Sequence, residues 1–497
     1  MSSKEKYKPT WNSLKRHRNP EWLDDAKYGI YYHWGIYSVP AFGPKMAKNG
    51  SWYGHAMYLE GTPQYKHHTK TYGHPSEFGY KDLIPLFTAE KFDPEEWAKL
   101  FKQVGAKFAG PVCIHHDGFA MWDSKVTKWN AAQMGPKRDT VGEMEKAIRK
   151  QGLKFMVAFH HAENHWFFPH WNKEYDVSNP EYSGLYGPIH DEDSKINLQW
   201  RWQRQAKPSN EYLDNWKAKI IEVLDNYKPD LIWFDFGLGK LPDKYKREML
   251  AYYFNKAEEW GKEVAVTYKM HNLPPSVGIL DYELGRADKL TYYKWITDSS
   301  VDDQGAWSYV KDAGYKSGET LVHNLVDRVS KNGYLLMNFG PKANGEIPEP
   351  ARNCLLQIGK WLEVNGEAIY NTTPWFTAGE GKTKLARGGM FSESSEVKYT
   401  AKDIRFTVKD NAIYAITLGW PGEEFKIKTL RKSYRKILRP YQVTIFYYLM
   451  DESDIRSIKM LGVDKELEWE LTETGLKIRT PNKKPCEHAY VFKISRT

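Results

Sequence analysis

The sequence predicts a (β/α)8-like barrel over residues 1–370, followed by an antiparallel β-sandwich over residues 371–497. Two observations carry this prediction. Up to about residue 365, eight short apolar segments alternate with amphipathic ones, which is typical of parallel strands joined by helices. After Tyr370 the helical periodicity stops, and short alternating segments bounded by turn residues follow, which is typical of a sandwich.

The predicted barrel strands are mostly near-continuous apolar runs, as expected for parallel strands buried on both faces. They cover Tyr28–Trp34, Phe108–His115, Leu153–His160, Leu231–Phe236, Val264–Tyr268, Gly278–Tyr282, Leu290–Ile296 and Tyr334–Phe339. The pattern is weakest in the seventh. A doubly wound open sheet would alternate in the same way, but no GxGxxG turn follows any early strand, so the barrel is favoured.

The predicted helices have apolar residues at helical spacing. The first begins at Asp93-Pro94-Glu95-Glu96, where a capping aspartate, a proline and two acidic residues suit a helix N-terminus. The others cover Glu211–Tyr227, Tyr245–Trp260, Glu319–Val329 and Glu349–Val364. In the sandwich, the predicted strands are Ile404–Val408, Ala412–Leu418, Phe425–Leu430, Ser457–Leu461 and Ala489–Ile494.

Residues 36–90 interrupt the first βα unit with a long stretch that has no clear period. A stretch of this kind predicts a loop, which in a barrel lies on the catalytic face. Its many aromatic residues, such as Trp52 and Tyr53, predict that the loop is ordered and packed, because disordered segments are poor in aromatic residues.

The composition excludes several classes of protein. The 72 Lys and Arg exceed the 63 Asp and Glu by nine, and this mild excess predicts no nucleic-acid partner. No apolar stretch reaches eighteen residues, which predicts no membrane span. Three widely spaced cysteines exclude a disulfide scaffold and a CxxC site. The polar first residues predict a cytoplasmic protein if they are the native N-terminus, or a periplasmic or secreted one if a signal peptide was removed.

Most of the excess positive charge lies in the predicted sandwich. Residues 371–497 hold 23 Lys and Arg against 16 Asp and Glu, and much of the excess falls in one run. The run contains Arg431, Lys432, Arg435, Lys436 and Arg439, with Tyr434 between them. It is either a solvated surface insertion or an anchor for an anionic glycan, such as the sulfated fucan fucoidan.

Polar residues follow six of the eight predicted strands, at the end where a (β/α)8 barrel carries its reacting groups. They are His33, His115, His116, Asp117, His160, His161, Glu163, Asp235, Lys269, His271, Asp281 and Glu283. Asp235 follows four apolar residues, and a buried carboxylate needs a partner or a cleft, so it is either a salt-bridged rim residue or a reacting group. Two facing carboxylates suit glycoside hydrolysis, and the neighbouring aromatic, His and Lys side chains suit sugar binding.

Five segments carry a family resemblance: KYGIYYHWGIYSVPA, FTAEKFDPEEWAKLFKQVGAKF, HHDGFAMWDSK, DLIWFDFG and LLMNFGPKANGEIP. Together they resemble glycoside hydrolase family 29, the retaining α-L-fucosidases, in order from about residue 20 to 375. The tail segments ITLGWPGEEFKI and KKPCEHAYVFKI are similar to that family's β-sandwich. The resemblance implies an exo-acting enzyme that hydrolyses fucosylated glycans without a cofactor.

The resemblance also implies roles for individual residues. Asp235 matches the family's nucleophile, and Trp233 matches a tryptophan that lines the site. His33, His115 and His116 match histidines that bind fucose hydroxyls, whereas His160 and His161 correspond less cleanly because many relatives have aromatic residues there. Many members have a Glu-Trp pair that touches the sugar; this chain keeps the tryptophan as Trp52 but has Ser51 before it.

The acid/base residue is less well defined by the resemblance, because it comes from a variable loop. Glu283 is the preferred candidate, since it ends the sixth predicted strand and has a long reach towards the mouth of the barrel. Asp281, Glu163 and Glu60 are the alternatives. In the expected double displacement, Asp235 attacks C1 of an α-L-fucoside while Glu283 protonates the departing oxygen.

Other readings remain open at this stage. A metal-dependent hydrolase is disfavoured, because the first strand lacks an HxH pattern and the adjacent His115 and His116 would point to opposite sides of an extended strand. We therefore expect no metal. A non-catalytic sugar-binding protein, an α-L-galactosidase and a transfucosidase are the remaining alternatives. The sequence does not indicate an oligomeric state.

Overall fold

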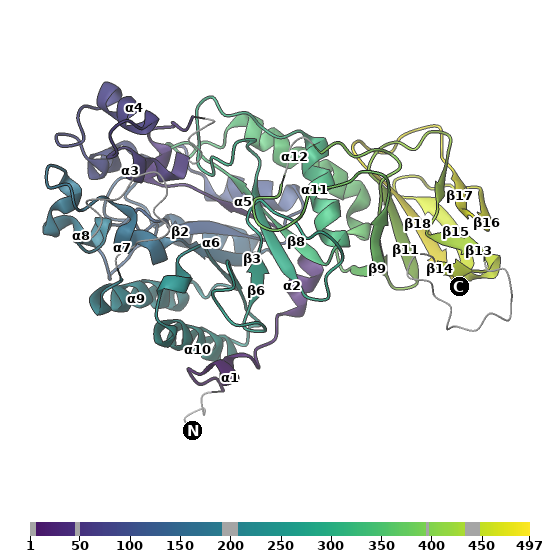
Figure 1. The fold of residues 1–497 in the computed structure, drawn as a ribbon, viewed down its shortest axis with the longest axis horizontal. Helices are drawn as coiled ribbons and strands as arrows, with labels where there is room; N and C mark the ends of the chain where they lie inside the picture. Colours follow the sequence, from purple (N-terminus) through teal and green to yellow (C-terminus); the bar gives the residue numbers. More distant parts are fainter. Residues whose placement is uncertain (1–5, 45–49, 191–206, 394–396, 433–447) are drawn as a thin grey trace.

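The computed structural model describes residues 6–44, 50–190, 207–393, 397–432 and 448–497. Eight parallel strands form a closed barrel in the order β1 to β8, with β8 pairing back to β1 (Figure 1). The strands are β1 (Tyr28–Tyr32), β2 (Phe108–Ile114), β3 (Lys154–Phe159), β4 (Leu231–Phe234), β5 (Ala265–Tyr268), β6 (Ile279–Asp281), β7 (Trp295–Ser300) and β8 (Gly333–Phe339). The predicted barrel is confirmed.

The prediction for the seventh strand was wrong in position. It covered Leu290–Ile296, whereas β7 covers Trp295–Ser300. The second half of β7 reads Asp298-Ser299-Ser300, and these polar residues are buried at the end of the barrel. The apolar pattern therefore stops at Ile296, whereas the strand continues to Ser300.

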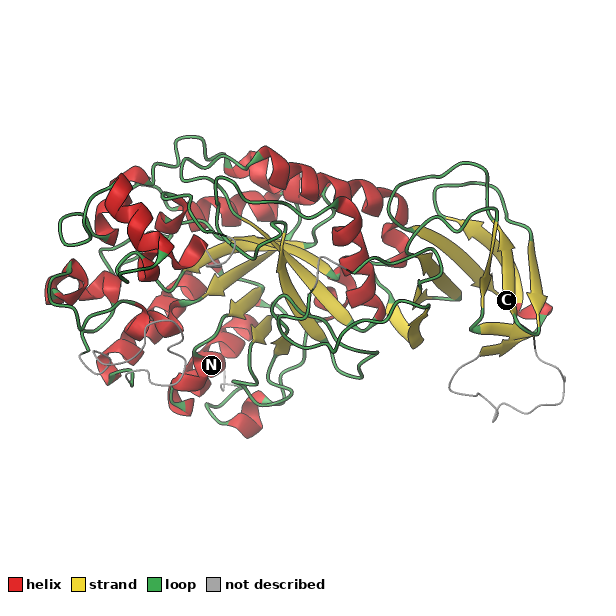
Figure 2. Ribbon diagram, turned by 45° about the horizontal axis from the view of Figure 1, so that its top comes forward, coloured by secondary structure: helices red, strands yellow, loops and turns green. Residues whose placement is uncertain are grey.

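Helices surround the barrel, as Figure 2 shows with helices in red and strands in yellow. Each predicted helix is present within two residues, as α5 (Pro94–Gln103), α9 (Asn210–Tyr227), α10 (Asp243–Trp260), α11 (Gly318–Ser330) and α12 (Glu349–Asn365). Asp93 caps α5 as expected, since its Oδ1 accepts from the amides of Glu95 and Glu96 at 2.9 and 3.1 Å. Helix α6 (Thr140–Lys150) was not predicted, and no helix follows β5 or β6 in the fully described stretch 265–300.

The stretch 36–90 is ordered, but it is more helical than a loop. Its described part contains η1 (Ile36–Ser38), η2 (Gly50–Trp52), α3 (Tyr53–Ala56), α4 (Pro63–Thr71) and η3 (Tyr80–Leu86). Tyr53 and Tyr58 are buried in the main core, which is why these short helices pack on the barrel. None of the described helices is long and apolar enough to cross a membrane.

The C-terminal region is a β-sandwich, as predicted. One sheet is antiparallel in the order β15 (Ile455–Met460), β18 (Tyr490–Arg496), β11 (Ala412–Thr417), β10 (Ile404–Lys409) and β9 (Thr373–Glu380). The facing sheet is β12 (Glu424–Ile427), β17 (Gly475–Arg479) and β16 (Trp469–Thr472), beside the short pair β13 (Leu430–Lys432) and β14 (Tyr448–Met450). Apolar side chains of both sheets, such as Phe406 and Ile478, share one core.

Two details of the sandwich differ from the sequence prediction. The predicted strand Phe425–Leu430 is two strands, β12 and β13, separated by Lys428-Thr429, and β9, β14, β16 and β17 were not predicted. In the basic run, Arg431 and Lys432 lie on β13, whereas Tyr434, Arg435, Lys436 and Arg439 lie outside the described residues. The domain boundary at 370/371 stays a prediction; α12 ends at Asn365 and β9 begins at Thr373.

A buried charge cluster joins the sandwich to the barrel. The fully buried Asp327 of α11 lies 2.9 Å from Arg405 Nε of β10 and 2.9 Å from Lys331 Nζ. Although burial raises the pKa of a carboxyl group, the positive charges of Lys331, Arg405 and Arg328 hold the pKa of Asp327 well below its usual value.

Replacing Asp327 by asparagine should lower the free energy of unfolding by about 3–5 kcal/mol, because Arg405 and Lys331 then stay buried without the negative charge that balances them. Urea unfolding measures the change. The matched control is Asp464→Asn in an exposed loop of the sandwich, which should change the stability by less than about 0.5 kcal/mol. Equal stability of the two variants would contradict the proposed role of Asp327.

Candidate active site

The predicted strand-end residues come together at one end of the barrel, because the C-terminal ends of parallel strands meet there. His33 follows β1, His115 and His116 follow β2, and His160 follows β3. Asp235, Lys269 and Glu283 follow β4, β5 and β6. All seven side chains are buried, with Asp235 7% and Glu283 8% exposed.

Asp235 lies among three potential cations. Its Oδ1 is 3.0 Å from Lys269 Nζ, and its Oδ2 is 3.3 Å from His116 Nε2 and 3.7 Å from His160 Nε2. Burial raises the pKa of this carboxyl group, but Lys269, His160 and His116 outweigh burial and hold the pKa well below its usual value. Asp235 is therefore a carboxylate at neutral pH, as a nucleophile must be.

Lys269 connects the carboxylates of the site. Its ammonium group contacts Asp235, hydrogen-bonds to Glu283 Oε2, and lies 3.5 Å from Asp298 Oδ2. It also lies over the rings of Trp233 and Phe236, at 4.5 and 4.7 Å from their centroids. Burial lowers the pKa of Lys269, but the surrounding carboxylates raise it well above the usual value. The positive charge of Lys269 therefore lies within 3.5 Å of three acidic residues, Asp235, Glu283 and Asp298.

Glu283 keeps its proton at neutral pH. Burial, opposed by Lys269 but reinforced by the charges of Asp298 and Asp235, raises the pKa of Glu283 to about 8. A carboxyl group that is protonated at pH 7 and shares a lysine partner with an ionised carboxylate can act as a general acid.

The three other candidates for the acid differ in what they contact. Asp281 is fully buried. Its two oxygens already accept hydrogen bonds, one from the indole of Trp233 and one from the Asp298 backbone amide. Glu163 is buried with Oε2 3.9 Å from His116 Nδ1, and burial raises its pKa to about 7, so it remains the main rival of Glu283. Glu60 lies on an exposed turn.

His33 is held as a neutral ring by a hydrogen-bond network at the end of β1. His33 Nδ1 lies 2.8 Å from Asn338 Oδ1, and the Asn338 amide donates to Ser300 Oγ at 3.0 Å and to Trp307 O at 2.7 Å. This network orients the Asn338 oxygen towards His33, so Nδ1 carries the proton and Nε2 faces His160 Nε2 at 3.2 Å. Burial lowers the pKa of His33 to about 4.

The pKa values of His115, His160 and His116 are shifted in different directions. Burial lowers the pKa of His115 and His160 well below the usual value. Burial also lowers the pKa of His116, but Asp235 and Glu163 outweigh it and raise that pKa. His116 is thus the histidine of this cluster that most readily becomes positively charged.

The predicted aromatic residues also reach the site, but His161 does not. The Trp52 ring lies 5.3 Å from the ring of His116, and the Trp233 ring lies 5.1 Å from that of His160. His161 turns away, with Nε2 3.3 Å from the carbonyl oxygen of Trp216 on α9. Strand β3 ends at Phe159, and the chain turns at His160 into η4 (His161–Glu163). The rings of His160 and His161 therefore have different neighbours.

Comparison with known proteins decides the family. A family model described as alpha-L-fucosidase matches residues 1–367, and one described as alpha-L-fucosidase C-terminal domain matches residues 396–495. The tissue alpha-L-fucosidase of Bos taurus is 31% identical over 99% of this chain and 91% of its own. The human plasma alpha-L-fucosidase is 31% identical over 99% of this chain and 92% of its own.

The chain belongs to the α-L-fucosidase family.

Solved structures agree with this membership. The Thermotoga maritima alpha-fucosidase in complex with fucose has 31% identity and a TM-score of 0.74, and it covers 98% of this chain and 100% of its own. The same protein with a mechanism-based inhibitor has 32% identity and a TM-score of 0.75, over the same shares. These matches confirm the resemblance in the sequence and show that this fucosidase-family chain is a glycoside hydrolase.

Several residues of this fucosidase site were not predicted from the sequence. Asp298 accepts from Tyr31 Oη at 2.9 Å and lies beside Lys269, and it was missed because the predicted seventh strand ended at Ile296. Asn338 is the one polar residue in the apolar run YLLMNF, which is a signal that the sequence does contain. The Trp307 ring lies 5.4 Å from that of His33, and no local pattern points to it.

Three histidines of the fucosidase site could hold a metal ion. Side-chain nitrogens of His33, His115 and His160 lie within 4.8 Å of one another, and neutral imidazoles are good ligands for Zn²⁺. His115 and His116 were expected to point to opposite sides of an extended strand, but β2 ends at Ile114, so the alternation of side chains does not apply to them. The absence of a metal therefore stays a prediction.

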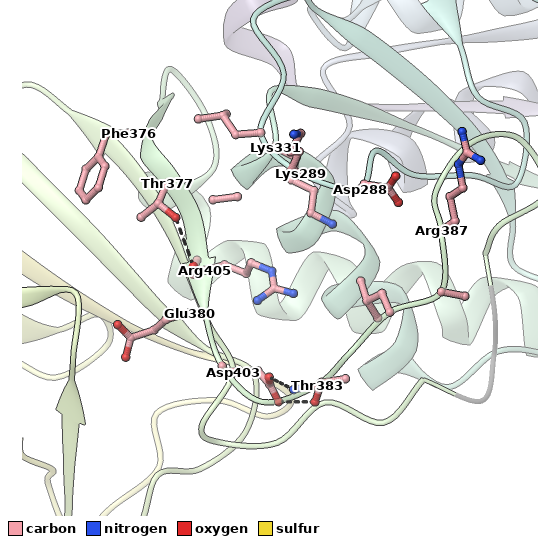
Figure 3. A pocket seen from close by; sticks show the side chains of 16 residues that line it. Asp288, Lys289, Lys331, Phe376, Thr377, Glu380, Thr383, Arg387, Asp403 and Arg405 are labelled. Atoms are coloured by element: carbon pink, nitrogen blue, oxygen red, sulfur yellow. Dashed lines mark hydrogen bonds between the residues drawn. The ribbon is translucent and has the colours of Figure 1, made fainter. Parts of the chain in front are cut away.

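A separate cavity lies away from these residues, where the barrel meets the sandwich. It has a volume of about 910 Å³ and lies between residues 288–290 of the barrel and strands β9 and β10 of the sandwich (Figure 3). None of the predicted site residues lines it. Two of its cationic residues, Lys331 and Arg405, are paired with Asp327. Their positive charges are therefore partly neutralised and less able to attract an anion into the cavity.

Proposed function

We propose that this enzyme is a retaining exo-α-L-fucosidase that acts on fucosylated glycans by double displacement. The observation that carries the proposal is that the carboxyl groups of Asp235 and Glu283 both contact the ammonium nitrogen of Lys269. The two groups have pKa values displaced in opposite directions, which is what a nucleophile and a general acid require.

In the first step, Asp235 attacks C1 of the fucoside, and the bond between C1 and the leaving oxygen breaks. That oxygen takes the proton of Glu283, and a covalent fucosyl-Asp235 ester forms. In the second step, Glu283 removes a proton from water, the water oxygen attacks C1, and the ester bond breaks. L-Fucose leaves with the configuration of the substrate, and Glu283 is protonated again.

The separation of the two carboxyl groups supports retention. One oxygen of each group contacts Lys269 Nζ, and the longer contact is 3.0 Å, so these oxygens lie within about 6 Å of each other. Inverting enzymes keep the two groups about 6.5–9.5 Å apart to admit a water molecule between them.

The surrounding side chains suit the hydroxyl groups and the apolar faces of fucose. Neutral imidazoles such as His33 and His115 both donate to and accept from hydroxyl groups. The rings of Trp52 and Trp233 offer apolar surface beside them.

The proposal is tested by following the hydrolysis of 4-nitrophenyl α-L-fucoside by proton NMR. We expect the anomeric signal of α-L-fucose to appear first and that of the β anomer to grow later by mutarotation. If β-L-fucose appears first, the enzyme inverts and Asp235 is not a nucleophile. A parallel reaction after exhaustive chelation should proceed at the same rate; loss of activity that Zn²⁺ restores would instead favour a metal at the three histidines.

A further inference from the structure

A segment of the C-terminal region returns to the barrel and pairs with the loop that carries Glu283. We call residues Ala386–Glu393, between β9 and β10, the return segment (Figure 1). The Gly389 amide donates to Arg286 O at 2.8 Å, and the Arg286 amide donates to Gly389 O at 3.3 Å. The Phe391 amide donates to Glu283 O at 2.7 Å. The return segment therefore bonds directly to the backbone of the proposed acid.

Charged side chains fix both ends of the return segment. The Arg286 guanidinium donates to Ala386 O at 2.9 Å and to Ser392 O at 2.7 Å. The buried carboxylate of Glu393 accepts from Arg328 at 3.1 Å and also pairs with Lys316. Burial raises the pKa of Glu393, but Lys316 and Arg328 lower it below its usual value. Such charge-assisted bonds hold the segment in one place.

The same segment presents an exposed aromatic ring, which lies against the ring of Phe236. Phe391 is 62% exposed, although burying a phenylalanine side chain is worth about 1.5–3 kcal/mol. Its ring is nearly parallel to that of Phe236, at an angle of 13° with centroids 6.4 Å apart. Phe236 directly follows Asp235 in the sequence. The backbone of Phe391 is thus bonded to Glu283, and its ring lies against the residue that follows Asp235.

An exposed phenylalanine is not by itself evidence of a site, because single exposed apolar residues are common. The position of Phe391 is the distinguishing feature. The proposed acid protonates the oxygen that joins fucose to the rest of the glycan, so the leaving sugar must lie on the outer side of Glu283. The backbone amide of Phe391 is hydrogen-bonded to Glu283, and its side chain faces solvent. A ring on which that sugar packs would need both properties.

We propose that Phe391 binds the leaving sugar, a pyranose whose C–H face packs on the phenyl ring. This inference rests on the proposed fucosidase function and extends it to the leaving-group side. The aromatic ring has a negative face that attracts the positive edges of C–H bonds. The two family models leave residues 368–395 unmatched, so this platform belongs to the part of the chain that links the two matched regions.

The test compares kcat/KM of the wild type and Phe391→Ala on two kinds of substrate. α-L-Fucosyl fluoride has a single atom as its leaving group and needs neither a platform nor a proton donor. The second substrate is the fastest of a set of fucosylated oligosaccharides that differ in linkage. We expect Phe391→Ala to lose about tenfold on the oligosaccharide and less than twofold on the fluoride. Phe391→Trp should restore the oligosaccharide rate, because it restores an aromatic face.

The matched control is Tyr292→Ala, which removes a 97% exposed aromatic residue three positions before β7, at the opposite end of the barrel. It should leave both rates unchanged. An equal loss on the fluoride and the oligosaccharide, or a shifted alkaline limb of the pH profile, would show that Phe391 positions Glu283 or Asp235 and would overturn the proposal. So would an unchanged oligosaccharide rate. A wild type that does not hydrolyse the fluoride would instead contradict the fucosidase function itself.

Discussion

Replacement of Asp235 by glycine should lower kcat for 4-nitrophenyl α-L-fucoside by at least about 10⁴-fold, which corresponds to more than about 5 kcal/mol of transition-state stabilisation. The variant lacks the carboxylate that we propose as the nucleophile, while its partners Lys269 and His116 stay in place. Steady-state kinetics with purified wild type and variant measure the loss.

Azide provides the complementary measurement. In Asp235→Gly, a small anion can enter the space left by the carboxylate, beside Lys269, and attack C1 from the same side. We expect added azide to restore turnover and to yield fucosyl azide of the β configuration, which NMR identifies. Unimpaired hydrolysis by the variant without azide would refute the assignment of the nucleophile.

The matched control lies at the other end of the same strand. Asp230 precedes β4 and is buried, with Arg149 NH1 at 2.8 Å. Asp230→Asn should lower stability without abolishing kcat, because this carboxylate is at the N-terminal end of the barrel. A loss of kcat as large as that of Asp235→Gly would mean that damage to the fold, rather than loss of the nucleophile, explains both variants.

Replacement of Glu283 by alanine should have the second largest effect, and its size should depend on the leaving group. We expect kcat/KM for fucosylated oligosaccharides to fall by about 10²–10⁴-fold, because their leaving oxygen needs a proton. Fucosyl fluoride, which needs none, should react at close to the wild-type rate in the first step.

The pH profile gives an independent measure of the same residue. The acid acts only while it carries its proton, and the pKa of Glu283 is raised to about 8. Wild-type kcat/KM should therefore fall above about pH 8, and this alkaline limb should be absent in Glu283→Ala. Asp235 must be ionised and its pKa is held well below the usual value, so activity should persist into moderately acidic solution.

Glu163→Gln is the comparison that separates the two candidate acids. Glu163 has a pKa of about 7 and contacts His116 rather than Lys269. If Glu163 were the acid, its variant would show the leaving-group dependence and the loss of the alkaline limb, and Glu283→Ala would not. That outcome would transfer the role of acid to Glu163.

Local sequence patterns predicted much of the fold. Apolar runs located the barrel strands because parallel strands buried on both faces leave few polar positions. The exception is β7, whose second half consists of the polar residues Asp298, Ser299 and Ser300, buried at the C-terminal end of the barrel where the site lies. Asp235 could be located because four apolar residues precede it. Asp298 was missed because only Trp295 and Ile296 form the apolar run before it.

By itself, the sequence determined the barrel, the sandwich and the strand-end residues, since periodicity and strand ends are properties of neighbouring residues. Only the tertiary structure separated His161 from His160, placed Lys269 between three acidic residues, and gave Glu283 and Asp281 different partners. It alone also brought Phe391 to Glu283, across more than one hundred residues. Burial and the charges of distant segments set these contacts and the pKa values, and no local pattern encodes them.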